Sequence, residues 1–144
     1  MTYYVGLLDG SGDVWGVTIP DVPGMNGGGA TPEEAIGDAI SAFREVAAMM
    51  VADGTPLPKP RTLSEIIRDP EVAEDVAKGA TAVMVPLLLD KGRSVRANIS
   101  LDAGLLEAFD AEASRRGLTR SAFFVSAAMD KIIGAPGRKD GKAA

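Results

Sequence analysis

The chain has 144 residues, 46% of them apolar and 24% charged, a composition typical of one globular domain or two small ones. It contains no cysteine and no histidine, which excludes disulfides, Cys/His zinc sites, thiol chemistry and imidazole-based catalysis. Carboxylates, lysines and two tyrosines remain for acid–base chemistry, so an ordinary hydrolase or redox enzyme is disfavoured.

The sequence predicts no membrane segment and no signal peptide. Its longest apolar run covers residues 82–89, whereas a membrane span needs roughly 18 residues or more. The N-terminus has no basic segment before its apolar stretch and reaches Asp9 too early for a signal peptide. We therefore expect a cytoplasmic protein.

Charge is distributed unevenly along the chain, whose overall net charge is −5. Residues 1–90 carry 5 basic and 14 acidic side chains, a net charge of −9. Residues 91–144 carry 10 basic and 6 acidic side chains, a net charge of +4. This reversal predicts two modules with different partners.

The chain begins with the pattern of a β-hairpin. Residues 3–8 and 14–19 are rich in β-branched and aromatic side chains, and the turn-forming residues 9–13 separate them. The glycine-rich residues 25–30 are compatible with a short third strand or a loop.

The strongest helix signal covers residues 32–52. Thr31 is a suitable N-cap, Pro32 fits the first helical position, and Glu34 completes a capping box with Thr31. The apolar positions recur at helical spacing and comprise Ile36, Ile40, Phe43, Ala47 and Met50.

Three shorter elements are expected before residue 90. After a proline-rich connector at residues 56–60, residues 62–68 and 70–79 have the signals of short helices. Residues 80–89 form an apolar, valine-containing run that predicts a strand. Because Pro86 cannot donate to a sheet, this strand is expected at an edge or with a bulge.

The C-terminal module has one strand and two helices. Residues 93–101 alternate strictly between apolar and polar side chains, which is typical of a half-buried strand. Asp102 and Thr119 are suitable N-caps for the two helices that follow, and the polar residues 135–144 are expected to be disordered.

About 40 residues without a disulfide or metal bury too little surface to fold alone. We therefore expect a two-fold homodimer in which the strands of residues 93–101 pair antiparallel. A two-stranded ribbon of this kind fits the major groove of B-DNA. A higher oligomer through the first module stays open.

Two segments resemble known families. Residues 93–133 resemble the ribbon-helix-helix class of DNA-binding dimers. The runs I-P-D-V-P-G at residues 19–24 and G-A-T-P-E-E-A-I at residues 29–36 resemble the N-terminal domain of HicB antitoxins. The chain departs from that family at Ala30, where aspartate is common, and at Met25, where cysteine is often found.

The resemblance implies an α+β fold. A β-β-β-α-β partial RNase H-like domain at residues 1–90 would be followed by a ribbon-helix-helix domain at residues 91–134. It also implies a type II antitoxin, with no catalysis, cofactor or metal. The first module would neutralise a small basic HicA-type mRNA-cleaving toxin, and the second would repress the protein's own operon.

The DNA contacts follow from the resemblance and from side-chain chemistry. The strand positions that face base edges in this class are Arg96, Asn98 and Ser100, and Arg and Asn suit guanine and adenine respectively. The start of the second helix is the expected phosphate site, formed by Thr119, Arg120 and Ser121. The alternatives are a solvated strand face and ordinary helix capping.

The first module offers less specific candidates. Trp15 and Met25 are the candidate toxin contacts, although core packing explains Trp15 equally well. Two-metal nuclease chemistry is disfavoured because its candidate carboxylates are better explained as turn and helix-start residues: Asp9, Asp13, Asp21, Glu33 and Glu34. The main alternative function is a transcription regulator whose first module senses a ligand or another partner. A neighbouring reading frame for a small basic protein would favour the antitoxin.

Overall fold

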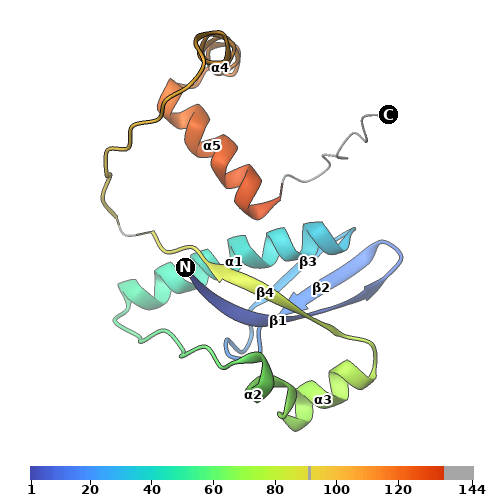
Figure 1. Cartoon of the computed structure of the whole chain (residues 1–144). Coiled ribbons are helices and arrows are strands. Elements are labelled where there is room, and N and C mark those ends of the chain that lie inside the picture. Colours follow the sequence, from blue (N-terminus) through green and yellow to red (C-terminus); the bar gives the residue numbers. More distant parts are fainter. Residues whose placement is uncertain (91, 135–144) are drawn as a thin grey trace. The chain divides into compact units, whose positions relative to one another are not determined.

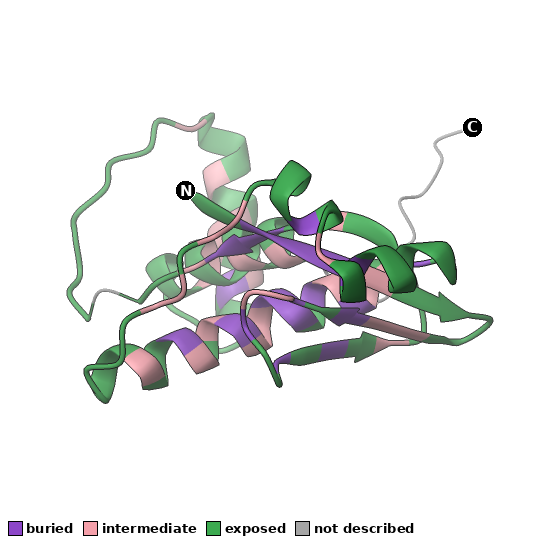
Figure 2. Ribbon diagram, turned by 90° about the horizontal axis from the view of Figure 1, so that it is seen from below, coloured by how far each residue is buried: buried purple, intermediate pink, exposed green. Residues whose placement is uncertain are grey.

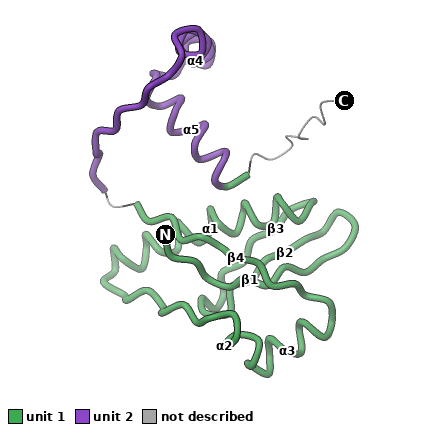
Figure 3. The backbone as a smooth tube through the Cα atoms, in the orientation of Figure 1, with its two compact units in different colours: residues 1–90, 133–144 green, residues 91–132 purple. Residues whose placement is uncertain are grey.

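The computed structural model describes residues 1–90 and 92–134, so Lys91 and the expected C-terminal tail at 135–144 lie outside the described residues. The chain divides after Asp90 into two compact units, coloured differently in Figure 3. We call residues 1–90 the first unit and residues 92–132 the second unit.

The first unit contains a four-stranded antiparallel sheet in the order β3-β2-β1-β4 (Figure 1). Its strands are β1 (Thr2–Ser11), β2 (Val14–Thr18), β3 (Asn26–Gly29) and β4 (Thr81–Leu87). The predicted hairpin is therefore confirmed, and the glycine-rich segment forms the short third strand. Pro86 lies in edge strand β4, opposite Tyr3 of β1, as expected for a residue that lacks a backbone donor.

The hairpin turn is shorter than the predicted turn at residues 9–13. Strand β1 continues to Ser11, with Asp9 paired to Gly16 and Gly10 paired to Trp15. Only Gly12 and Asp13 form the turn, and Gly12 has the positive φ of +59° that short hairpin turns favour. The prediction was too wide because cross-strand pairing overrides the local turn preference of Asp9 and Gly10.

Helix α1 (Pro32–Ala52) has the predicted bounds and N-cap. The Thr31 hydroxyl accepts a hydrogen bond from the Glu34 amide at 3.2 Å. The Glu34 carboxylate accepts from the Ala30 amide at 2.9 Å rather than from Thr31, so the predicted capping box is shifted by one residue. Both interactions still satisfy donors at the helix start.

Helix α1 covers one face of the sheet, and Figure 2 shows buried positions along it. Tyr4 and Phe43 pack edge to face with their ring centroids 4.8 Å apart, and both are almost completely buried. The Tyr4 hydroxyl donates to the carbonyl of Pro58 at 2.5 Å, which ties the proline-rich connector to the sheet. Other buried side chains of this core cluster include Val17, Ile19, Ile40 and Val85.

Two short helices contribute to a second, smaller core cluster. They are α2 (Leu63–Ile67), which Thr62 and Glu65 begin with a complete capping box, and α3 (Pro70–Ala77). Ile66 and Val72 of these helices are buried in one cluster with Val5, Leu7 and Ala80. The two helices end close to the bounds that the sequence predicted.

The second unit contains helices α4 (Ala103–Arg115) and α5 (Arg120–Ile133), begun as predicted by Asp102 and Thr119. Residues 93–101 carry no strand and pair with no described strand of the chain. The predicted strand is thus absent from the single chain, because a strand requires a hydrogen-bonded neighbour. No helix among residues 1–90 and 92–134 is long and apolar enough to cross a membrane.

Candidate functional site

The segment of residues 93–101 exposes both of its faces. Its polar residues Arg96, Asn98 and Ser100 are exposed, as base-reading residues must be. On the alternating positions, Val95 and Ile99 are 78% and 64% exposed, respectively. The segment therefore presents an apolar face that nothing in its own unit covers, next to the polar face.

The second unit has almost no core of its own. Ala113 is the one buried residue in its described part, and every other side chain is at least partly exposed. Phe109, Phe123 and Phe124 cluster with ring centroids 5.2–6.5 Å apart, yet all three stay partly exposed. The apolar material of a core is present, but a single copy leaves it open to water.

The expected phosphate site lies at the first turn of α5. The Thr119 hydroxyl accepts from the Ala122 amide at 3.1 Å, so ordinary capping is confirmed for this residue. Arg120 donates through Nε and Nη2 to the Asp110 carboxylate at 2.8 and 2.7 Å, and Ser121 is exposed. This fork ties α5 to α4, raises the pKa of Arg120 and lowers the pKa of Asp110. A phosphate bound at this end would compete with Asp110 for the Arg120 guanidinium.

Other arginines of the second unit are also paired internally. Arg115 and Arg116 both donate to the Glu112 carboxylate, at 2.6–2.9 Å. Their hydrogen bonds and positive charges lower the pKa of Glu112 to about 2. Among the described residues, Arg93 and Arg96 have no ion pair. The unpaired arginines of this unit thus lie in the segment that is predicted to read bases.

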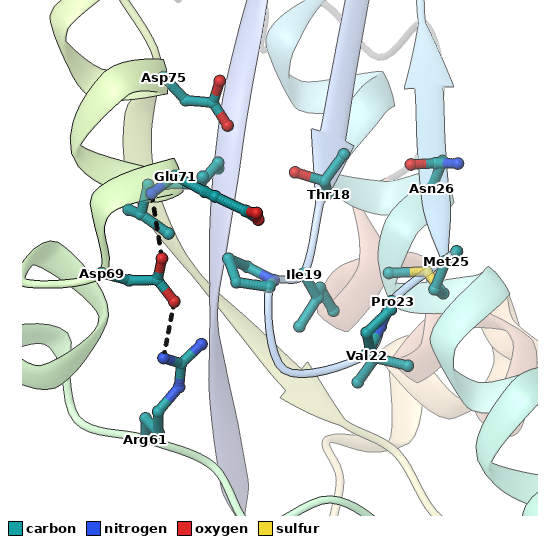
Figure 4. Close-up of a pocket in the computed structure, with 14 residues that line it drawn as sticks. Thr18, Ile19, Val22, Pro23, Met25, Asn26, Arg61, Asp69, Glu71 and Asp75 are labelled. Atoms are coloured by element: carbon teal, nitrogen blue, oxygen red, sulfur yellow. Dashed lines mark hydrogen bonds and ion pairs between the residues drawn. The ribbon is translucent and has the colours of Figure 1, made fainter.

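The first unit contains an open pocket of about 270 Å³, which we call the acidic pocket (Figure 4). One side is formed by α3 with Asp69, Glu71 and Asp75, and the other by the end of β2, the following loop and the start of β3. Its apolar surface comes mainly from Leu7, Ile19, Val22, Pro23, Met25 and Val72. No local pattern in the sequence predicts this pocket, because its walls come from separate segments of the chain.

Arg61 joins the two sides of the acidic pocket. Its Nε donates to Asp21 in the β2–β3 loop at 2.6 Å, and its Nη1 donates to Asp69 at the start of α3 at 3.0 Å. The Arg61 amide also donates to Asp21 at 2.8 Å. The Arg61 guanidinium lowers the pKa of Asp69, and the two carboxylates raise the pKa of Arg61. The β2–β3 loop, the residues before α2 and the start of α3 are thereby held together.

The two candidate toxin contacts have different surroundings. Met25 is only 5% exposed and belongs to the larger core cluster, yet it also lines the acidic pocket, so its role as a toxin contact stays a prediction. This core position explains why an apolar residue follows the P-G dipeptide. Trp15 is half-buried beside the same cluster, and its Nε1 donates to the carbonyl of Gly12 at 3.0 Å.

The carboxylates considered for metal chemistry are engaged separately. Asp9 accepts a hydrogen bond from the Gly10 amide, Asp21 from the Arg61 side chain, and Glu34 from the Ala30 amide. Each of these carboxylates therefore has its own local partner rather than sharing a common site. Within residues 1–90 and 92–134, no three acidic side chains converge as candidate ligands of a metal ion. The geometry of these carboxylates serves turns, caps and the Arg61 link.

Comparisons with known proteins agree on one family. The model of a family described as HicB-like antitoxin of bacterial toxin–antitoxin systems matches residues 3–128. An uncharacterized 14.9 kDa protein from the rep-hol intergenic region of Haemophilus phage HP1 is 33% identical over 98 residues, or 68% of this chain and 71% of the relative.

Solved structures show the same similarity. The crystal structure of the Burkholderia pseudomallei antitoxin HicB superposes with a TM-score of 0.54 and 28% identity, over 92% of this chain and 99% of the other. The crystal structure of an antitoxin HicB3 superposes with a TM-score of 0.52 and 26% identity, over 91% and 98% of the two chains.

Proposed function

This chain belongs to the HicB-like antitoxins of bacterial toxin–antitoxin systems, and on this premise we propose that it neutralises a HicA-type mRNA-cleaving toxin and represses its own operon. The first unit, as a partial RNase H-like domain, binds the toxin. The second unit, as a ribbon-helix-helix homodimer, binds operator DNA. Both roles are performed in the cytoplasm, and neither requires catalysis or a cofactor.

The exposed apolar face of residues 93–101 is the observation that best supports the DNA-binding role. Val95 and Ile99 stay in water in the single chain, and Ala113 is the one buried residue among those described in this unit. Antiparallel pairing with the same segment of a second copy supplies the missing strand neighbour and covers this face. The helices of both copies then enclose one shared core.

Pairing also places the polar residues for base recognition. Since Val95 and Ile99 point into the shared core, the alternating Arg96, Asn98 and Ser100 point away from it. Arg pairs with the O6 and N7 atoms of guanine, and Asn with the N6 and N7 atoms of adenine. Arg96 has no ion pair among the described residues, so its guanidinium is available for this contact.

The charge of the first unit supports the toxin-binding role. Its net charge of −9 complements the basic surface that an RNA-binding toxin must present. The acidic pocket also supports a different candidate, a transcription regulator whose first unit binds a ligand. The two candidates differ in whether the first unit binds a protein.

The DNA-binding role is tested by two variants of the full chain. Arg96→Ala should weaken operator binding by about 1–3 kcal/mol without changing the dimer, while Ile99→Asp should abolish both dimer and binding. Lys131→Ala removes another cation of the same unit and serves as the control. Gel-shift titration and size-exclusion chromatography measure the outcomes. Unchanged affinity of Arg96→Ala would refute the assignment.

The toxin-binding role is tested by co-expression with the small basic protein of an adjacent reading frame. We expect the two proteins to purify together and the chain to restore growth that the basic protein inhibits. A chain that neither binds this protein nor restores growth would favour the ligand-sensing regulator.

A further inference from the structure

We propose that the acidic pocket receives one lysine or arginine side chain of the toxin, which makes it the anchoring point of the toxin interface. The inference rests on the proposed toxin-binding function and adds a location and a chemistry to it. The observations that carry it are the size of the pocket, its apolar surface, its unbalanced charge and its fixed walls.

The size of the acidic pocket suits one long side chain. Its volume of about 270 Å³ is close to the lower end of the roughly 300–1,000 Å³ of typical ligand sites. Aliphatic side chains such as Ile19, Val22 and Val72 contribute to its surface, below a rim of carboxylates. Lysine and arginine match this combination because they bury an aliphatic stem while the charged end stays at a polar rim.

The charge of the pocket is unbalanced in a way that one added cation would relieve. Arg61 is its single cation, and it is already shared by Asp21 and Asp69. Glu71 and Asp75 also line the pocket, yet neither carboxylate has a hydrogen-bond or ion-pair partner among the described residues. Figure 4 shows both side chains on the α3 side, facing the Thr18 and Asn26 side.

The walls of the pocket are held in place before any partner binds. Arg61 links Asp21 of the β2–β3 loop to Asp69 at the start of α3, across the two sides of the pocket. Val72 lies below the rim in the smaller core cluster and fixes α3 on the sheet. A site that is already ordered loses less conformational entropy on binding, so its contacts contribute more to affinity.

The test compares two double variants of the full chain that remove the same number of charges. Glu71→Gln with Asp75→Asn neutralises the unpaired carboxylates of the pocket. Glu74→Gln with Glu45→Gln neutralises two exposed carboxylates outside it, one on α3 and one on α1. Association with the purified basic protein of the adjacent reading frame is measured by calorimetry, after thermal unfolding has established that both variants are folded.

The pocket variant should bind this protein at least about tenfold more weakly than the control variant, since close charge pairs at interfaces are strongly coupled. Each basic residue of the partner protein is then replaced by alanine in turn. One of these replacements should weaken binding to the unmodified chain but leave binding to the pocket variant unchanged. Equal binding by the two variants, or coupling spread evenly over many basic residues, would overturn the pocket proposal. Failure of the unmodified chain to bind would instead refute the proposed function.

Discussion

The packing of β3 against α1 leaves no room for a side chain at Gly27. A Cβ atom at this position would lie 2.4 Å from the nitrogen and 2.5 Å from the Cα of Ala39 in α1. Both atoms belong to the backbone, so the clash cannot be relieved by rotating a side chain. Restoring normal contact requires β3 and α1 to separate by about 1 Å.

The neighbouring Gly28 provides a matched control. It lies in the same short strand but is exposed, and an added Cβ would meet only the carbonyl oxygen of Trp15 at an ordinary 3.6 Å. Neither glycine has a positive φ, so alanine suits the backbone at both positions. The two variants therefore differ in packing alone.

We expect Gly27→Ala to lower the free energy of unfolding by about 1.3 kcal/mol, the difference between two opposing contributions. Overpacking against a backbone costs about 1–3 kcal/mol, and the loss of glycine's freedom in the unfolded chain returns about 0.4–1 kcal/mol. Gly28→Ala should have only the second contribution, which raises the free energy of unfolding by about 0.4–1 kcal/mol. Urea unfolding followed by the fluorescence of Trp15, the single tryptophan, measures both. Equal urea midpoints for the two variants would refute the close packing of β3 on α1.

Two further predictions concern ion pairs. Arg61→Leu should destabilise the first unit by about 1–3 kcal/mol in urea unfolding, because the Asp21 side chain is only 7% exposed and loses its cation. The control Lys78→Leu removes an exposed ion pair and should change the stability by less than about 0.5 kcal/mol. The Glu112 carboxyl should titrate near pH 2 by NMR and return toward 4.5 when Arg115 is replaced by alanine. Since folding lowers this pKa, the contribution of Glu112 to stability is complete above about pH 4.5 and disappears as the pH falls toward 2. A titration midpoint of Glu112 near pH 4.5 in the unmodified chain would contradict this.

Local signals in the sequence predicted most helices and strands. Thr31, Thr62 and Asp102 each cap a helix where the sequence placed one, because a cap needs only neighbouring residues. The apolar spacing of residues 32–52 likewise predicted which side of α1 is buried. The α+β class and the HicB-type family were also predicted correctly from the sequence.

Contacts between distant residues were beyond the reach of those signals. The link from Arg61 to Asp21 and Asp69 joins residues up to 48 positions apart. Local signals therefore predicted neither this link nor the acidic pocket whose two sides it joins. The burial of Met25 in the core was not predicted for the same reason, since it depends on how the β2–β3 loop packs on the core.

The sequence by itself determined where helices begin and end, which faces are apolar and where the charge changes sign, because these depend on residues a few positions apart. Only the tertiary structure decided the length of β1, the approach of β3 to α1 and the assembly of the acidic pocket, because each depends on strand register and on packing between distant segments. Residues 93–101 show the division most clearly: their alternation is set by the sequence, but a strand forms only where another strand supplies its hydrogen bonds.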